Sequence, residues 1–513
     1  MKIRKMKKNK SPSSIPNWPL FGMLPSLLWN LPRLHEFVTD ILKLNGGTFV
    51  FKGPSFTNLN FILTSDPANV HHIVTNNFSN YPKGPELKAI MAPFGDVLFN
   101  SDGDSWKTKK DIVLSLIKTA GFERLLMTTL RHKLADSLIP VLDHHAARNH
   151  DDGGVVLDLQ DVMKRFMFDL TCLLFLGIDP ECLSTSFPRV PCAEAFDVLE
   201  EAVVYRHCVP KWVWKLQRWL HVGWEGKTVK AEECLNGFVE ERIRVKMVEK
   251  RAKNYDFLMK LIVETERLMG DCYSSKFVRD IVVSSMVAGR DTIAVALSWF
   301  FWLVATNPGV EDKILEELDR VVITQTAGEK EVIFSSIEEL NKMVYLHGAI
   351  SETLRLYPSV PYEPKQSLKD DVLPSGHIVG RNTRVLVSIY SMGRMEDVWG
   401  KDWMEFRPER WVAVSNDNKK INIIHVPSYK FAAFMAGPRS CSGRKIAYTQ
   451  MKTIISCVLR KYKIDVVGDH PVVPLPSIMM FMRHGLKVRI SSRTPVSTII
   501  NVVNSILPVD SVE

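Results

Sequence analysis

The chain has 513 residues, of which 46% are hydrophobic and 24% are charged. This balance excludes a disordered protein, a collagen-like fibre and a protein that crosses the membrane many times, and the length is sufficient for a large buried core. The formal net charge is +9, but six Lys or Arg residues and no acid lie among the first ten residues, which leaves only +3 on the remainder. A basic tail on a nearly neutral body argues against nucleic-acid binding, and we predict no nucleic-acid partner.

The pattern along the chain predicts a mainly α protein with small peripheral β-sheets. Helical periodicity dominates from about residue 105 to about residue 360. Stretches typical of short strands lie on either side of this region, at 49–52, 60–63, 384–389, 478–482 and 485–490. Helices in the middle and strands at both ends favour a single large domain over residues 18–493.

Two terminal segments fall outside this domain. Residues 1–17 form a basic tail rich in Ser and Pro, and residues 494–513 form a C-terminal extension. The uncharged stretch 292–306 is too short to cross a membrane, so we expect a buried core helix there and no ordinary transmembrane helix. Eight cysteines occur without a CxxC pair, which favours a reducing compartment.

One short segment, from Phe434 to residue 447, carries the most specific chemical signal. Cys441 lies just before a helical pattern, and a helix N-terminus lowers a thiol pKa and favours the thiolate. Gly443 leaves room for a large flat group to approach the backbone, and Arg439 is placed to bind an anionic group. A thiolate with these neighbours suits haem iron better than zinc, which needs several protein ligands.

This segment matches every fixed position of the haem loop F-x-x-G-x-R-x-C-x-G, and on it the chain resembles the cytochrome P450 superfamily. The resemblance implies the cytochrome P450 fold, with Cys441 as the axial ligand of the haem iron. Two further motifs follow the order of that family. Glu352 and Arg355 match E-x-x-R, whose spacing puts both side chains on one helix face. The resemblance implies that Arg410, from the later F-x-P-E-R segment, joins this pair as a structural residue.

The stretch from Ala288 to Thr292 reads AGRDT and matches A-G-x-D/E-T. In the family this stretch crosses the haem on the oxygen side. The resemblance implies that Asp291 and Thr292 relay the protons that O–O bond cleavage consumes. It also implies that Val287 and Ala288 limit the bulk of a substrate beside the haem.

The haem propionates require cations and hydrogen-bond donors. By match with the family, Arg439 and Trp106 are candidates for this role. The usual W-x-x-x-R is here Trp106-x-x-x-Lys110, and the position ten residues after Arg355, often arginine, is Lys365. Lysine supplies charge without the planar fork of arginine, so we expect haem to bind, but less firmly.

Local runs are similar to one plant branch of the family, the alkane-hydroxylase-like group of mid-chain alkane and fatty-acid hydroxylases. These runs read NWPLFGMLP, DPANVHHIV and NNFSNYPKGPE. The resemblance implies hydroxylation of a long-chain alkane or fatty acid, including mid-chain alkanes of cuticular wax. It implies haem b (iron protoporphyrin IX), O2, and electrons from NADPH through NADPH-cytochrome P450 reductase. It also implies the cytoplasmic face of the endoplasmic reticulum membrane, although relatives normally begin with a membrane anchor that is not visible here.

Two apolar segments have both a functional and a structural interpretation. Met480 and Phe481 are candidates for lining an adaptable substrate pocket, and the same residues are equally compatible with a strand packed in the core. The segment 211–219 mixes tryptophans with cations, which suits the lipid headgroup region. We expect Trp212 and Trp214 to contact a membrane surface, with core packing as the alternative.

Two other functions fit the residues less well. An enzyme of the same fold that rearranges lipid hydroperoxides needs neither O2 nor a reductase, and the intact Asp291–Thr292 pair argues against it. A non-catalytic haem- or lipid-binding protein is compatible with Lys110 and the missing anchor. The intact Cys441 and the intact E-x-x-R pair argue against that alternative.

Overall fold

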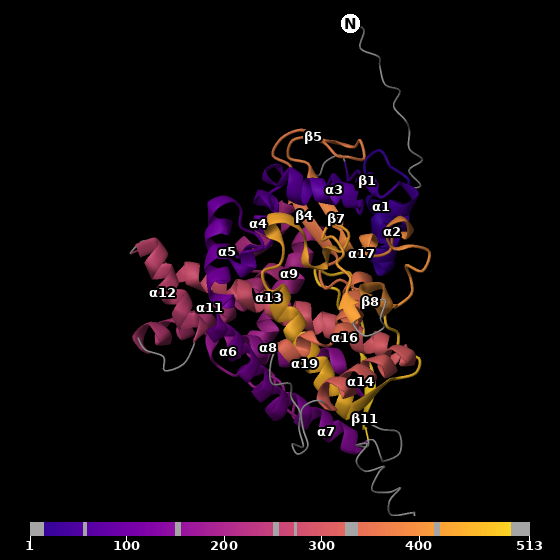
Figure 1. Ribbon diagram of the computed structural model, residues 1–513. Coiled ribbons are helices and arrows are strands. Elements are labelled where there is room, and N and C mark those ends of the chain that lie inside the picture. The colour runs from indigo at the N-terminus through magenta and orange to yellow at the C-terminus, as the bar shows by residue number, and fades with distance from the viewer. Residues whose placement is uncertain are drawn as a thin grey trace, which may run out of the picture.

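The computed structural model describes residues 15–54, 59–148, 155–249, 256–270, 274–323, 337–414 and 421–493. The first 14 residues of the expected basic tail and the whole expected C-terminal extension lie outside the described residues. Helices make up most of the fold and the sheets are small and separate, so the predicted fold class is confirmed (Figure 1).

The core is built around one long helix, α13 (Ser275–Ala305). It packs most extensively against α8 (Leu159–Leu176), and it also contacts α16 (Val344–Leu356) and α19 (Arg444–Lys461). By length and composition α13 could cross a membrane, but 78% of its apolar window is buried inside the protein. This burial is that of a core helix, because neighbouring helices cover the apolar side chains.

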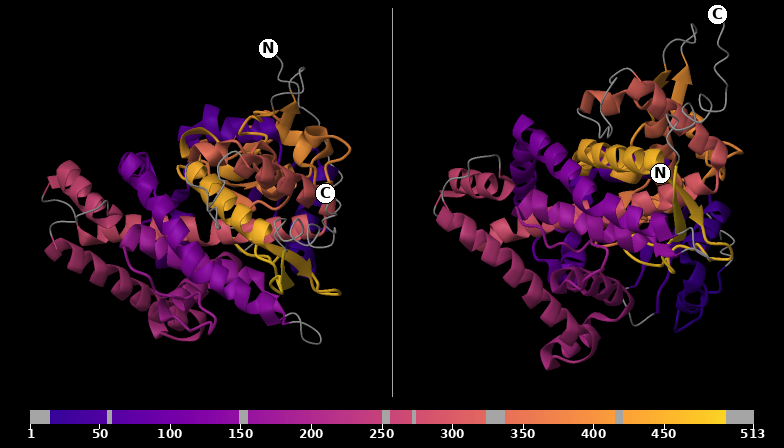
Figure 2. Two further views of the ribbon diagram at one scale, coloured as in Figure 1. Left: turned by 60° about the horizontal axis from the view of Figure 1, so that its bottom comes forward. Right: turned by 90° about the horizontal axis from the view of Figure 1, so that it is seen from below.

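The other helices surround this centre. Figure 2 shows α11 and α12 at the side of the molecule opposite the indigo N-terminal elements. The helices of eight or more residues, apart from those already given, are α2 (Leu34–Leu44), α5 (Gly103–Ile117), α6 (Ala120–Lys133), α7 (Ile139–Ala147), α9 (Pro191–Cys208), α10 (Lys211–Leu220), α11 (Gly223–Glu249), α12 (Phe257–Met269) and α14 (Pro308–Ile323). The shorter ones include α1 (Leu24–Trp29), α3 (Pro67–His71), α4 (Gly84–Ile90), α15 (Ile337–Asn341), α17 (Ile389–Met392) and α18 (Glu396–Trp399).

The largest sheet has four strands in the order β1-β2-β7-β4, with β2 and β7 parallel and the other pairs antiparallel. Its strands are β1 (Thr48–Phe51), β2 (Phe61–Thr64), β4 (Tyr362–Gln366) and β7 (Arg384–Ser388). A second sheet has the order β10-β11-β3, from β10 (Tyr462–Val466), β11 (Lys487–Ser492) and β3 (Leu157–Asp158). Two-stranded sheets pair β5 (Asp371–Val372) with β6 (Ile378–Val379), and β8 (Val412–Val414) with β9 (Ile421–Ile423).

The strand expected at 478–482 is wrong, because this segment forms a bend and only Met482 pairs, in an isolated bridge with Pro474. Tertiary partners satisfy its backbone instead of a sheet ladder. The N–H of Met480 donates to the carbonyl of Ser359 at 2.9 Å, and Trp299 Nε1 donates to the carbonyl of Met480 at 2.6 Å. Because these bonds fix the chain against α13, the alternating pattern does not produce a strand.

Candidate active site

Cys441 lies at the end of a loop that is fixed from both sides. Its N–H donates to the carbonyl of Phe434 at 2.8 Å, and α19 begins three residues after it. Gly437 in the same loop has φ +67°, and a Cβ there would clash with the carbonyl oxygen of Val74. Only glycine therefore allows the loop to pack against residue 74, and this packing holds the cysteine in place.

The protein groups around the Cys441 sulfur favour the neutral thiol. The residue has an exposed side, yet desolvation raises the pKa of its thiol, while the N–H of Gly443 and the charge of Arg444 act in the opposite direction. The lowered pKa expected from the helix terminus is therefore wrong for the protein groups alone. A metal cation bound to the sulfur would supply the missing positive charge and hold the thiolate. A Cβ on Gly443 would meet only the Cys441 sulfur, at 3.9 Å, so this side is open to a flat group.

Arg439, two residues before Cys441, is held beside Trp106. Its Nη2 lies 2.6 Å from Oδ1 of Asp102 and donates to the carbonyl of Ser101 at 2.7 Å. The guanidinium lies 4.5 Å from the centroid of the Trp106 ring. Its Nε is buried and has no hydrogen-bond partner among the described residues, so a donor is left for a further group. Lys110, one turn after Trp106, donates to the carbonyl of Pro438.

A second group of charges lies on strand β4. Glu363 and Lys365 are two positions apart on the strand, so they lie on the same face of the sheet. Both side chains are buried. Lys365 Nζ lies 3.1 Å, and Lys83 Nζ 2.7 Å, from the same oxygen, Oε1 of Glu363. Burial, together with the charges of Lys83 and Arg439 and opposed only in part by Glu363, lowers the pKa of Lys365 to about 8.

These two groups fit a haem with two propionates. They hold two more cations than carboxylates, and the excess matches the charge of two propionates. The cations are Lys83, Lys110, Lys365 and Arg439, and the carboxylates are Asp102 and Glu363. Cys441 would hold the iron, with Phe434 and Gly443 beside the ring. When bound, the haem supplies the activation of O2 for insertion of one oxygen atom into a C–H bond.

The E-x-x-R pair is fully buried and bidentate. Nε and Nη2 of Arg355 each lie 2.7 Å from a carboxylate oxygen of Glu352. Trp411 Nε1 donates to the same carboxylate at 2.8 Å, and Arg410 Nε lies 3.3 Å from it. Arg355 also donates to the carbonyl of Trp403 at 2.8 Å. This network ties α16 to the segment that precedes the haem loop, so its residues are structural.

The two residues of the predicted oxygen motif face different surroundings. Thr292 lines a large apolar cavity, and its hydroxyl donates to the carbonyl of Ala288 at 2.6 Å. Asp291 is fully buried beside Arg290, whose Nη1 lies 3.5 Å from Oδ2 of Asp291. Burial raises the pKa of the Glu200 carboxyl on α9 well above its ordinary value, and the charge of Asp291 adds to this. The threonine therefore belongs to the cavity, whereas the carboxylate belongs to a polar cluster behind it.

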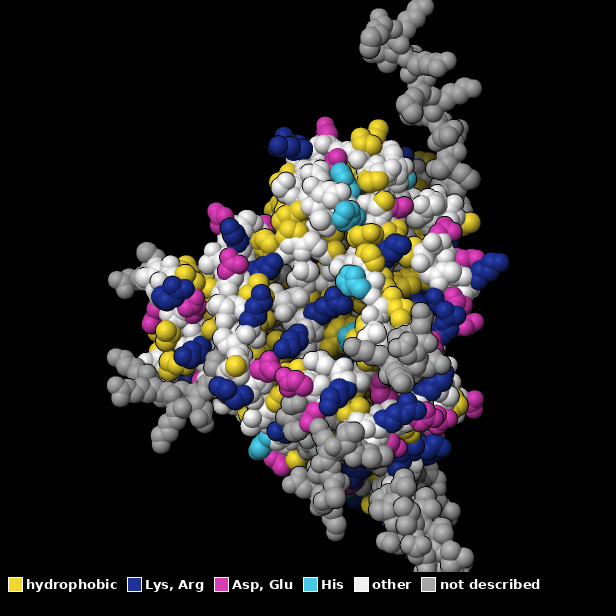
Figure 3. Space-filling view, viewed as in Figure 1, with side chains coloured by type: hydrophobic (Ala, Val, Ile, Leu, Met, Phe, Trp, Pro, Cys, Tyr) yellow, Lys and Arg dark blue, Asp and Glu magenta, His cyan; other side chains and the backbone are white. Residues whose placement is uncertain are grey.

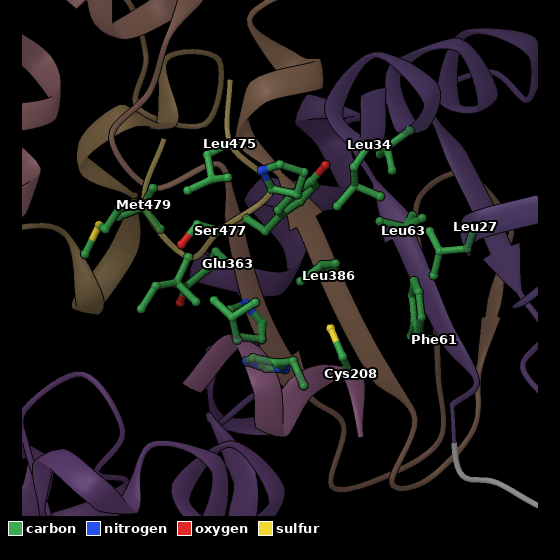
Figure 4. A pocket seen from close by; sticks show the side chains of 18 of the residues that line it. Leu27, Leu34, Phe61, Leu63, Cys208, Glu363, Leu386, Leu475, Ser477 and Met479 are labelled. Carbon is green, nitrogen blue, oxygen red and sulfur yellow. The ribbon is translucent and has the colours of Figure 1, made fainter. Parts of the chain in front are cut away.

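The cavity next to Thr292 has a volume of about 970 Å3 and an almost entirely apolar wall. Val287 and Ala288 line it from α13, as the sequence predicts. The rest of the wall comes mainly from the N-terminal region from α1 to β2, the segment 83–99, the C-terminal end of α9, strands β4 and β7, and the bend at 475–479 (Figure 4). Glu363 is a charged member of this wall, together with Lys83.

Met480 and Phe481 are not among the residues that line this cavity, so their prediction as pocket residues is corrected. Met480 is fully buried, and the hydrogen bonds of its backbone turn it into the core. Ile478 and Met479 line the cavity instead. The segment is the right one, but the bend shifts the lining positions by two residues.

Sequence reasoning missed Lys83, Glu363 and Glu200. Glu363 lies two residues before Lys365, and this strand spacing is a signal that places both on one face. The positions of Lys83 and Glu200 depend on contacts between distant segments, for which the sequence carries no local signal.

Comparisons with known proteins identify the family of the chain. The cytochrome P450 family model matches residues 12–491. The chain is 38% identical to alkane hydroxylase MAH1 of Arabidopsis thaliana over 495 residues. This matched region covers 95% of each protein. It is 39% identical to cytochrome P450 86B1 of Arabidopsis thaliana over 95% of this chain and 87% of that protein. It is 37% identical to noroxomaritidine synthase 2 of a Narcissus species over 95% of this chain and 93% of that protein.

The family model spans nearly the whole chain, and the structure places the haem-loop cysteine just before α19 and the buried E-x-x-R network on α16, two helices that both contact α13. The protein is a monooxygenase of the cytochrome P450 family.

Proposed function

We propose that this monooxygenase hydroxylates a C–H bond of a long-chain aliphatic substrate, an alkane or a fatty acid, including mid-chain carbons of wax alkanes. The observation that carries the proposal is the apolar cavity of about 970 Å3, which runs from Thr292 on α13 to Leu27 and Leu28 on α1. An extended hydrocarbon chain gains about 0.8 kcal/mol for each methylene buried in such a wall. The printed names of relatives, among them alkane hydroxylase MAH1, support the same substrate class.

Reconstituted turnover tests this proposal. The protein is loaded with haem and supplied with NADPH, NADPH-cytochrome P450 reductase and either an alkane or a fatty acid of matched chain length. We expect a mono-hydroxylated product by mass spectrometry, at a position that labelled substrates identify. Cys441→Ala is the control for thiolate ligation. If neither the alkane nor the fatty acid is oxidised while NADPH is still consumed, the aliphatic substrate class is wrong.

We propose that the reductase docks on the basic face around the haem loop. Figure 3 shows Lys and Arg side chains gathered on this face, in the region of α5, α6 and α19. The exposed members are Lys107, Lys118, Arg124, Arg444 and Lys445. A positive surface favours encounter with an acidic partner, and this attraction weakens with salt. Lys107→Glu combined with Lys118→Glu should therefore raise the KM for reductase without changing the affinity for substrate.

We also propose that the protein works at the cytoplasmic face of the endoplasmic reticulum membrane and meets lipid through α10. Trp212 and Trp219 on this helix are 69% and 75% exposed. Trp214 is buried, with the guanidinium of Arg206 4.5 Å from its ring, so the expected lipid contact of Trp214 is corrected to core packing. The tryptophans lie just after the end of α9, which lines the cavity.

Vesicle binding tests this surface. Trp212→Ala with Trp219→Ala should reduce co-sedimentation with phospholipid vesicles. Met404→Ala, which removes an apolar side chain exposed on another part of the surface, should not. Equal binding by the wild-type protein and the double variant would contradict a lipid contact at α10.

A further inference from the structure

One end of the apolar cavity lies between the N-terminal helices and the segment 473–483. Leu28 and Leu31 line the cavity from the N-terminal side and are 59% and 41% exposed, so the cavity is open to solvent here. Arg483 lines the same cavity, and its side chain bonds to Pro32, the residue after Leu31. These three residues, Leu28, Leu31 and Arg483, mark the mouth of the cavity.

Arg483 is fixed at the mouth by both its backbone and its side chain. Its N–H donates to the carbonyl of Val473 at 2.9 Å, and its Nη2 donates to the carbonyl of Pro32 at 2.8 Å. A guanidinium carries more N–H donors than this one side-chain bond uses. Within the part of the chain that the structure describes, no carboxylate and no second acceptor binds the guanidinium of Arg483. Most of its planar fork is therefore available to an anion from outside the protein.

The other basic side chains of the cavity wall do not offer such a cation. Lys83 Nζ is buried and lies 2.7 Å from Oε1 of Glu363, so a second carboxylate would have to displace a buried partner. His207 lies near the C-terminal end of α9, where desolvation lowers the pKa of its imidazole to about 4 and the charge of Arg384 adds to this. The imidazole is therefore neutral near pH 7.

The wall beyond the mouth is suited to a hydrocarbon and not to a charge. It is almost entirely apolar from the α1 side to Val287 and Ala288 beside Thr292. Burial of an unpaired carboxylate inside such a wall would cost far more than it gains, whereas at the open mouth the carboxylate stays partly hydrated and meets a guanidinium. A chain with one anionic end therefore fits this cavity in one direction.

We propose that Arg483 binds the carboxylate of a fatty acid at the mouth, so that the hydrocarbon chain extends along the apolar wall toward Thr292. The inference rests on the proposed aliphatic substrate class and selects the fatty acid within it, because an alkane has no group for Arg483 to bind. Arg483 is a specificity-determining residue, remote from the carbon that is oxidised.

Two ligands that differ only in the head group test this assignment. The haem-loaded protein is titrated at neutral pH with hexadecanoate and with hexadecanol, and the Soret shift gives each Kd. Arg483→Gln should raise the Kd for hexadecanoate by about three- to tenfold and leave the Kd for hexadecanol unchanged. Arg483→Lys keeps the charge but loses the fork, so its Kd should lie between those of wild type and Arg483→Gln. Arg381→Gln, which removes an exposed cation outside the cavity wall, is the control and should change neither Kd.

Two results with the variant would overturn the proposal. The first is an unchanged Kd for hexadecanoate in Arg483→Gln. The second is an equal weakening of both ligands, because Arg483 would then only hold the mouth in shape through its bond to Pro32.

Salt dependence of the wild-type protein decides the question even if the variant does not fold. The ratio of the hexadecanoate Kd to the hexadecanol Kd should rise with ionic strength, because salt screens a partly exposed ion pair. A constant ratio would contradict the role of Arg483. A wild-type protein that binds neither ligand would refute the aliphatic substrate class itself, and this inference with it.

Discussion

Lys83 Nζ lies 2.7 Å from Oε1 of Glu363, and both side chains are buried in the wall of the apolar cavity. Lys365, on the same strand as Glu363, lies 3.1 Å from the same carboxylate oxygen. Glu363 therefore lies between two lysines, Lys83 and Lys365, that have different surroundings. On one side it neutralises Lys83 in the wall of the apolar cavity, and on the other it partners Lys365, a candidate for binding a haem propionate.

Removal of the Glu363 carboxylate should destabilise the fold more than removal of Lys83. Glu363→Gln leaves two buried lysines without their shared partner, which costs about 3–5 kcal/mol. Lys83→Met leaves Glu363 still paired with Lys365 at 3.1 Å and should cost less. Urea denaturation measures both. Glu86→Gln, which breaks a partly exposed pair with Arg384 at 3.0 Å, is the control and should cost at most about 1 kcal/mol.

The contribution of Glu363 should also depend on pH. Burial alone would raise the pKa of its carboxyl, but Lys83 and Lys365 lower it from 4.5 to about 2. The stabilisation is therefore fully present above pH 4.5 and is lost as the pH falls toward about 2. The difference in unfolding free energy between wild type and Glu363→Gln should shrink over this interval. A difference that stays constant would contradict the ion pair as its source.

Haem uptake should weaken in the wild-type protein as the pH rises through about 8, the pKa to which burial lowers Lys365. Above this pH the haem-free protein loses the Lys365 charge that attracts a propionate. Lys365→Arg keeps its charge and should remove this loss. Titration with haemin, followed by Soret absorbance, gives the affinity. Deprotonation of Cys441 affects both proteins alike, so identical pH profiles would exclude a role for Lys365.

The parts of the site that the sequence predicts are those fixed by short-range spacing. Cys441, Glu352 and Arg355 lie in segments whose local geometry a few residues determine, so their motifs predict where these side chains lie. Met480 shows where this reasoning ends. Its direction is set by a hydrogen bond from Trp299, 181 positions away, and no local period reports such a bond. Sequence periodicity therefore located the cavity segment but not the residues that line it.

Tertiary packing also determines the surroundings of two further groups of residues that the sequence does not predict. Trp212 and Trp214 are two positions apart on a helix, which puts them on different faces, so only one of them remains exposed. Asp197 is 93 residues from Arg290, and their ion pair at 2.6 Å exists only because α9 lies beside α13. Pairings of this kind follow from tertiary packing and lie beyond any single segment.

Arg355 should be the least replaceable cation of the structural network. It is fully buried and bound through two nitrogens to Glu352, so Arg355→Lys loses the bidentate geometry as well as the bonds to backbone carbonyls. We expect a loss of about 3–5 kcal/mol and little haem-loaded protein on purification. Arg410→Lys should be milder, because its contact with Glu352 is longer, at 3.3 Å. Equal haem content in the two variants would contradict this order.

Narrowing the cavity at its two ends should have different effects on chain-length preference. Leu27→Trp fills the α1 side of the cavity and should weaken the binding of long alkanes more than that of short ones. We expect a loss of about 0.8 kcal/mol, or fourfold in Kd, for each methylene displaced. Ala288→Phe narrows the cavity beside Thr292 and should weaken the binding of long and short alkanes alike. Substrate-induced Soret shifts give the Kd values, and Phe481→Leu, outside the cavity wall, is the control. If Leu27→Trp affects all chain lengths equally, the hydrocarbon chain does not extend toward α1.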